Sequence, residues 1–146
     1  MRITETAEQR HAFEDGIRKW IGTEDKAIAN CDKLISSSDN KLVKAIAGAI
    51  RADAVKHKEI LREISEVLTS TVSLSPDELG AISKLLDDYV EMEKKPIEMG
   101  AHEKSSGENF VVRELLAYIL EDEKKYDRFR DELNKFKAKI YPYGVS

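Results

Sequence analysis

The pattern of apolar and polar residues repeats at an offset of 69 positions. Apolar residues match at this offset, as in Ile50 with Ile119, and so do polar residues, as in Glu24 with Glu93. Within each half the apolar residues recur every three or four positions, which is the period of an α-helix with one buried face. The repeat therefore predicts two copies of one helical hairpin.

The helices are expected over about 6–35, 41–68, 76–103 and 109–140. The polar turn SSSDN, the stretch TSTVSLS and the turn KSSGEN separate them. Ser75 and Glu78 form a capping-box pattern, and Pro76 stands at the first helical position. Pro96 is expected to bend the third helix. Because β-branched alternation is nearly absent and only three prolines occur in 146 residues, the predicted fold class is all-α.

Each predicted helix carries a polar residue in the middle of its apolar stripe. These residues are Glu24, His57, Glu93 and Tyr126, with Glu123 at the edge of the fourth stripe. Burying a lone carboxylate costs several kcal/mol unless it gains a partner, a proton or a metal ion. The same anomaly on four helices indicates that these residues meet at one level of a four-helix bundle. The structural alternatives are carboxylates paired with Lys or Arg and a hydrogen-bonded core histidine.

This arrangement resembles the ferritin-like superfamily, and most closely its rubrerythrin-related branch. Those proteins hold two metal ions with one Glu on each of two helices and a Glu-x-x-His on each of the other two. The matching residues are Glu24, Asp53-Ala54-x-x-His57, Glu93 and Asp122-Glu123-x-x-Tyr126. The resemblance covers nearly the whole chain and implies one ferritin-like four-helix bundle domain over 1–146.

The resemblance also implies a partly degenerate iron site, mononuclear or dinuclear. Its metal ligands are Glu24, His57, Glu93 and Glu123, and Asp53 and Asp122 stand behind them, where such residues orient a ligating imidazole. Ala54 replaces a carboxylate that often bridges both metals. Tyr126 replaces a histidine, and a phenol of pKa about 10 is a poor ligand unless a ferric ion deprotonates it. A core tyrosine whose hydroxyl bonds Glu93 or Glu123 is therefore favoured at this position.

The connection between the second and third helices leaves two topologies open. A ferritin-like bundle needs a crossover along its whole length, and residues 68–82 fully extended would just span roughly 40 Å. The capping box at Ser75 makes part of this stretch helical and shortens its reach. A simple up-down-up-down bundle is the alternative.

Two functions follow from the pattern. The first is an oxidoreductase-like protein in which Fe(II) reacts with O₂ or peroxide at an open coordination position, with no catalytic residue assigned beyond the ligands. The second is a non-catalytic bundle that has lost metal competence and serves as a binding or assembly module. A weaker third option is that the space left by Ala54 admits a small ligand or water.

Charge and composition limit the partners and the location that we expect for this chain. The net charge is −4, with basic and acidic residues interspersed, which argues against nucleic acid. No run approaches the roughly 18 apolar residues of a membrane span. The segment MRITETAEQR has no apolar stretch, so no secretory signal is expected. The single cysteine, Cys31, excludes an internal disulfide and a rubredoxin-type CxxC module. A cytoplasmic location is expected, and a homodimer is compatible with the resemblance.

Overall fold

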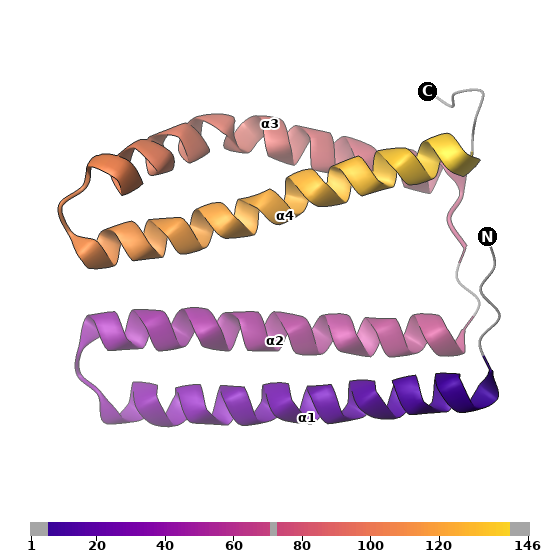
Figure 1. Cartoon of the computed structure of the whole chain (residues 1–146), viewed down its shortest axis with the longest axis horizontal. Coiled ribbons are helices and arrows are strands. Elements are labelled where there is room, and N and C mark those ends of the chain that lie inside the picture. The colour runs from indigo at the N-terminus through magenta and orange to yellow at the C-terminus, as the bar shows by residue number, and fades with distance from the viewer. Residues whose placement is uncertain (1–5, 71–72, 141–146) are drawn as a thin grey trace. The chain divides into compact units, whose positions relative to one another are not determined.

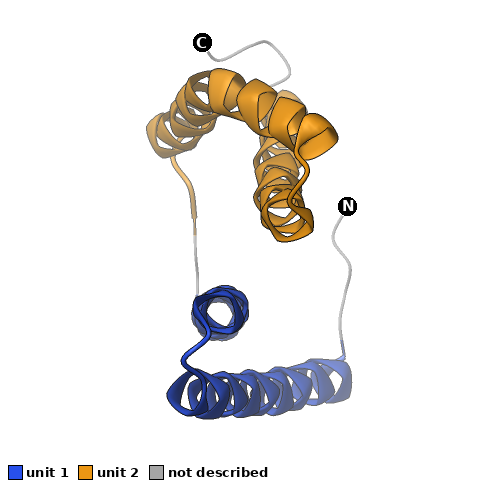
Figure 2. Ribbon diagram, turned by 90° about the vertical axis from the view of Figure 1, so that its left-hand side faces the viewer, with its two compact units in different colours: residues 1–72 blue, residues 73–146 orange. Residues whose placement is uncertain are grey.

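The computed structural model describes residues 6–70 and 73–140, and every regular element within them is an α-helix. The helices are α1 (Ala7–Ser37), α2 (Lys41–Thr69), α3 (Pro76–Ser106) and α4 (Phe110–Ile140) (Figure 1). Helix α1 packs against α2, and α3 packs against α4. The chain thus forms two compact units, residues 1–72 and 73–146, each built on one helical hairpin (Figure 2). The predicted all-α class with four helices in two hairpins is confirmed.

The helices begin at side chains that cap them. Each capping side chain accepts hydrogen bonds from backbone N–H groups of the first turn, and the capping residues are Thr6, Asn40, Ser75 and Asn109. The predicted capping box is confirmed: Glu78 N–H donates to the Ser75 hydroxyl at 3.1 Å, and Ser75 N–H donates to Glu78 Oε1 at 3.1 Å. Pro76 is the first residue of α3. These caps satisfy N–H groups that have no partner within the helix.

The first hairpin, α1 with α2, has a narrow core. On α2 the buried residues Ala47, Ala54 and Leu61 are spaced seven apart, which places them on one face of the helix. Two ion pairs join α1 to α2: Arg51 Nε to Asp32 Oδ1 at 2.7 Å, and Lys58 Nζ to Asp25 Oδ1 at 2.5 Å. The two residue numbers add up to the same value in both pairs, so both agree with a single antiparallel alignment of α1 and α2.

In the second hairpin, α3 with α4, helix α3 is curved, whereas α1 and α2 are straight (Figure 1). Helix α3 continues through Pro96, and its curvature agrees with the predicted bend. Its buried residues include Leu79 and Leu86, and Gly100 is also buried. A Cβ at Gly100 would lie 3.6 Å from Leu120 Cδ2, which is an ordinary van der Waals distance, so Gly100 faces Leu120 of α4.

Both hairpins leave large apolar side chains exposed. On α2, Ile50 and Ile64 lie seven residues before and after His57 and are 49% and 37% exposed. On α3, Leu85 and Met92 are 68% and 66% exposed. A pair of helices buries only one seam, so stripes this wide indicate a further packing partner.

The connection between α2 and α3 consists of residues 70–75. Fully extended, it reaches about 25 Å between the two helices that it joins. Helix α2 has 29 residues and is therefore about 43 Å long. A connection of this length cannot run along the whole of that helix, so it does not supply the crossover of a ferritin-like bundle. How the two hairpins sit relative to each other stays a prediction. That both hairpins form a single domain stays a prediction.

None of the described helices has both the length and the apolar character needed to cross a membrane.

Candidate functional site

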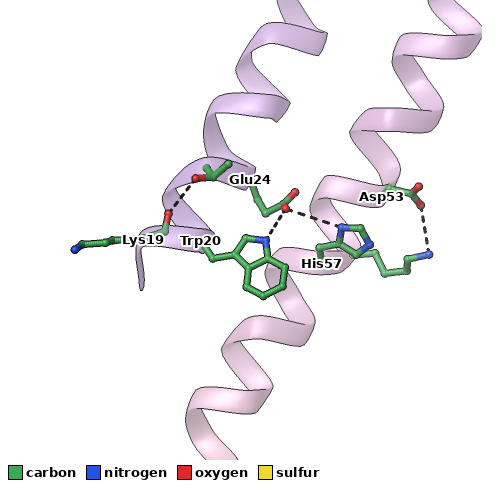
Figure 3. A network of polar contacts seen from close by, with 7 residues as sticks. Lys19, Trp20, Glu24, Asp53 and His57 are labelled. Carbon is green, nitrogen blue, oxygen red and sulfur yellow. Dashed lines mark hydrogen bonds and ion pairs between the residues drawn. The ribbon is translucent and has the colours of Figure 1, made fainter. Parts of the chain in front are cut away.

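The first hairpin brings two predicted ligands together, Glu24 from α1 and His57 from α2 (Figure 3). The distance from His57 Nδ1 to Glu24 Oε1 is 4.0 Å, which is too long for a hydrogen bond and makes an ion pair only when the imidazole is protonated. The Trp20 indole Nε1–H donates a hydrogen bond to the same oxygen at 3.1 Å. The Glu24 side chain is only 13% exposed, whereas that of His57 is 43% exposed. Glu24 is therefore fixed by one hydrogen bond, from Trp20, and lies beside the imidazole of His57.

Two other predicted positions lie beside this pair on α2. Ala54 is buried, with 3% of its surface exposed, in the seam between α1 and α2. Asp53 forms an ion pair with Lys56 Nζ at 3.3 Å (Figure 3). That Asp53 orients the imidazole of His57 stays a prediction.

The second hairpin gathers its polar residues around Tyr89 of α3. The Tyr89 hydroxyl donates a hydrogen bond to Glu123 Oε1 of α4 at 3.1 Å. The rings of Tyr89 and Tyr126 lie 4.7 Å apart between centroids, at 54° to each other. Burial raises the pKa of Tyr89 to about 12, with smaller contributions from the hydrogen bond to Glu123 and from the charges of Glu123 and Glu93. The hydroxyl that bonds Glu123 thus belongs to Tyr89, and Tyr126 contributes its ring.

Glu93 and Glu123 line the same open groove between α3 and α4, which has a volume of about 360 Å³. Four acidic side chains and two basic ones line it, and these are Glu93, Glu98, Glu123, Asp127, Lys94 and Arg130. The acidic excess favours a cation in this groove. The other predicted neighbour, Asp122, forms an ion pair with Lys125 Nζ at 2.7 Å.

The four predicted ligands occupy matching places along their helices. Glu24, His57, Glu93 and Glu123 each lie within two residues of the midpoint of α1, α2, α3 and α4, respectively. Each hairpin thus contributes two of them. Among the residues that the structure describes, no three His, Cys, Asp or Glu side chains lie close enough together to hold a metal ion. That the two pairs converge stays a prediction.

Two residues of the site were missed from the sequence, Trp20 and Tyr89. They occupy equivalent positions of the repeat, and each stands four residues before a site carboxylate, Glu24 or Glu93. Residues four apart are neighbours on a helix surface, so an aromatic side chain with an N–H or O–H group at this spacing was the available signal. For Trp20 this spacing identifies the observed acceptor, Glu24. Tyr89 instead donates to Glu123 on the neighbouring helix.

Comparison with protein-family models, curated proteins and solved structures finds no match to this chain. The fold and the site therefore define it only as an all-α protein of two helical hairpins, each with a carboxylate-containing polar cluster near mid-helix.

Proposed function

We propose that this chain is related to the rubrerythrin branch of the ferritin-like superfamily, without that superfamily's bundle-length crossover, and that it binds a metal ion through Glu24, His57, Glu93 and Glu123. The observation that carries the proposal is the contact between Glu24 and His57, which brings a carboxylate and an imidazole together in the middle of an apolar surface. Carboxylate and imidazole groups suit iron, and they also suit manganese and zinc. Iron is the metal that the resemblance favours.

The donor sets of the two hairpins complement each other. One hairpin offers a carboxylate and an imidazole, and the other offers two carboxylates in an acidic groove. Two donors are fewer than a stable site requires, whereas three carboxylates and one histidine are enough for one ion. The proposed site therefore requires all four side chains to bind the same ion.

The proposed activity is of the oxidoreductase or peroxidase type. A bound iron ion would supply one-electron redox chemistry, with an open coordination position for O₂ or peroxide. The residues of this chain hold the ion, and the surrounding apolar side chains exclude water from it. A cytoplasmic location and a homodimeric state belong to the same proposal.

A second candidate function is a non-catalytic binding or assembly module. It is favoured by the exposed apolar side chains of each hairpin, among which Leu85, Met92 and Met99 of α3 are about two-thirds exposed. It is also favoured by Ala54, which removes one of the six side chains of the family's metal site. Such a protein would keep the helical hairpins and use their apolar faces to bind another protein.

Metal content separates these two functions. The protein is expressed in iron-supplemented medium, purified without chelator, and measured for Fe, Mn and Zn per chain. We expect about one ion per chain and its loss in Glu93→Ala and His57→Ala, because each change removes one of four donors. Glu91→Ala and His102→Ala are matched controls, since both residues are exposed on α3. Metal below one-tenth of an ion per chain, or metal content that Glu93→Ala leaves unchanged, would remove the metal-binding function and leave the assembly module.

A further inference from the structure

Helix α3 carries a stripe of large apolar side chains on its exposed surface, which we call the α3 stripe. Its members, Leu85, Met92 and Met99, are spaced seven residues apart and therefore lie along one side of the helix. They are 68%, 66% and 67% exposed. Helix α3 packs on α4 through other residues, and Leu79 and Leu86 are among those that are buried. The α3 stripe therefore lies outside the packed seam of the hairpin.

The α3 stripe has no apolar counterpart in the first hairpin. At the offset of 69 positions, its three members correspond to Gly16, Thr23 and Asn30 of α1, in that order. All three of these α1 residues are exposed. Apolar positions that both halves share can be explained by the packing that both halves have in common, whereas this stripe belongs to α3 alone. A row of exposed large apolar side chains marks an interaction surface, so the α3 stripe requires a partner of its own.

We propose that the α3 stripe is the contact surface of a homodimer, in which α3 of a second copy packs against it in antiparallel orientation. The two-fold axis passes beside Met92, so Met92 faces Met92 of the second copy, and Leu85 faces Met99 of the second copy. In a two-fold interface every contact occurs twice with the copies exchanged, and the equal spacing on both sides of Met92 meets this condition. The proposal gives a surface to the homodimer of the proposed function and does not depend on metal binding.

The charges beside the α3 stripe fit the same alignment. Asp88 and Lys95 stand three residues after Leu85 and Met92, so both border the stripe on one side, and both are exposed. Antiparallel pairing about Met92 brings Asp88 of each copy close to Lys95 of the other, because these residues stand four before and three after Met92. Asp88 also pairs with Lys84 Nζ at 2.6 Å within α3, but that pair is exposed and weak. This charge complementarity identifies a second copy of the chain as the occupant.

The size of the contact predicts a weak dimer. Helix α3 has 31 residues and is therefore about 46 Å long. A contact face about 10 Å wide, the spacing of packed helices, would bury about 450 Å² on each copy. The total of about 900 Å² lies below the roughly 1,200–2,000 Å² of stable complexes. We therefore expect a reversible dimer with a Kd in the micromolar range.

Sedimentation velocity of the full chain, over a wide range of protein concentration, tests the proposal. Met92→Lys places two like charges at the two-fold axis, and we expect it to raise the Kd of the dimer at least about tenfold. Thr23→Lys is the matched control, because position 23 of α1 is the repeat equivalent of position 92 and is also exposed. We expect Thr23→Lys to leave the Kd unchanged.

An exchange of charges tests the antiparallel alignment. Asp88→Lys brings like charges together in both symmetric pairs, and we expect it to raise the Kd about fivefold. Asp88→Lys combined with Lys95→Asp makes every pair opposite again, so we expect the wild-type Kd. Only an alignment that pairs position 88 of one copy with position 95 of the other predicts this rescue.

A wild-type chain that sediments as a monomer at all concentrations would overturn the proposal and leave the α3 stripe to a different protein or to another part of this chain. A wild-type Kd in Met92→Lys would place the dimer contact elsewhere and overturn it as well. A double exchange that fails to restore the dimer would overturn the alignment. The metal content of the same preparations is measured separately, so these results leave the metal-binding proposal standing. Circular dichroism checks folding, and if Met92→Lys fails to fold, the exchange at the two exposed charged positions decides.

Discussion

Each hairpin has a glutamate at the same repeat position of its first helix, Glu24 in α1 and Glu93 in α3. The contacts that join the two helices near this glutamate differ between the hairpins. In the first hairpin, α2 offers His57 at 4.0 Å from Glu24, and its Ala54 is buried in the seam. In the second hairpin, α4 carries Glu123 at the position equivalent to Ala54, and Tyr89 bonds it directly. An acceptor on the neighbouring helix is thus available to Tyr89, whereas Trp20 bonds the glutamate of its own helix.

The same repeat thus supports two kinds of polar cluster. An aromatic donor and a carboxylate acceptor are present in both halves. The acceptor stands on the donor's own helix in the first half and on the neighbouring helix in the second. The first hairpin compensates with ion pairs between its helices, Arg51 with Asp32 and Lys58 with Asp25. In the second, Arg130 lies 4.0 Å from Asp87, which is a weaker link. Near these glutamates the difference between the hairpins therefore lies in the partners of the polar side chains.

Among the changes that test this difference between the hairpins, a carboxylate introduced at position 54 should have the largest effect on stability. Ala54→Glu places a charged, larger side chain in a buried position, and without metal we expect a loss of about 3 kcal/mol in the free energy of unfolding. Ala52→Glu is the control, because Ala52 is exposed on the same helix, and it should change stability by less than about 0.5 kcal/mol. Urea unfolding measures both. Equal effects of the two changes would show that position 54 is not a constrained seam position.

The Ala54→Glu change also tests metal binding when it is combined with Tyr126→His. The double change restores both residues that depart from the family pattern, so we expect more metal per chain than in the wild type. No increase would mean that the helices do not align these positions around one site.

Removing the two aromatic donors should cost different amounts of stability. Tyr89→Phe removes a bond between helices and leaves the partly buried Glu123 without that donor, so we expect a loss of about 2 kcal/mol. Trp20→Phe removes a bond within one helix, and we expect about 0.5 kcal/mol. Urea unfolding of both variants gives the comparison, with Tyr126→Phe as the control. A larger loss for Trp20→Phe than for Tyr89→Phe would contradict the expectation that the hydrogen bond between the helices of the second hairpin stabilises the protein more.

Alkaline pH should weaken the second hairpin through Tyr89. Its pKa is raised to about 12 in the folded protein, above the value of about 10 for an unfolded tyrosine. The folded state therefore prefers the neutral phenol, and this stabilisation is complete below pH 10 and is lost as the pH rises through about 12. We expect the stability difference between wild type and Tyr89→Phe to shrink between pH 9 and pH 11.5. A constant difference over this range would contradict the raised pKa.

The ion pairs between helices should have the smallest effects. Lys58→Ala removes a pair with a separation of 2.5 Å, and we expect a loss of about 0.5 kcal/mol that salt reduces further. Arg130→Ala removes the pair with Asp87 at 4.0 Å and two long pairs within α4, with Asp127 and Asp131 at 3.8 and 3.9 Å, and we expect almost no loss from it. Thermal melting at 50 mM and 500 mM NaCl measures both. A larger salt-sensitive loss for Arg130→Ala would show that the second hairpin depends more on ion pairs than the first.

The helices and their pairing were predictable because they depend on local signals and on the repeat. The predicted helix over 41–68 corresponds to α2, Lys41–Thr69, because Asn40 caps its start. The start of α3 followed from Ser75, Pro76 and Glu78 in the same way. Signals of this kind lie within a few residues of each other, so they do not require knowledge of the tertiary structure.

The partners of the site residues were only partly predictable. The pairing of Glu24 with His57 followed from two apolar stripes in an antiparallel hairpin. The bond from Tyr89 to Glu123 did not follow, because it depends on the register between α3 and α4. Side-chain contacts between helices depend on these details of register, which the period of the apolar pattern does not specify.

The proposed function requires Glu24, His57, Glu93 and Glu123 to bind one ion. The most direct measurement is an anomalous difference map from crystals grown with Co(II). The predicted result is one peak per chain, about 2.0–2.2 Å from the His57 imidazole nitrogen and from carboxylate oxygens of both hairpins. A map without such a peak, with these four side chains at different heights or directed into bulk water, would contradict the claim.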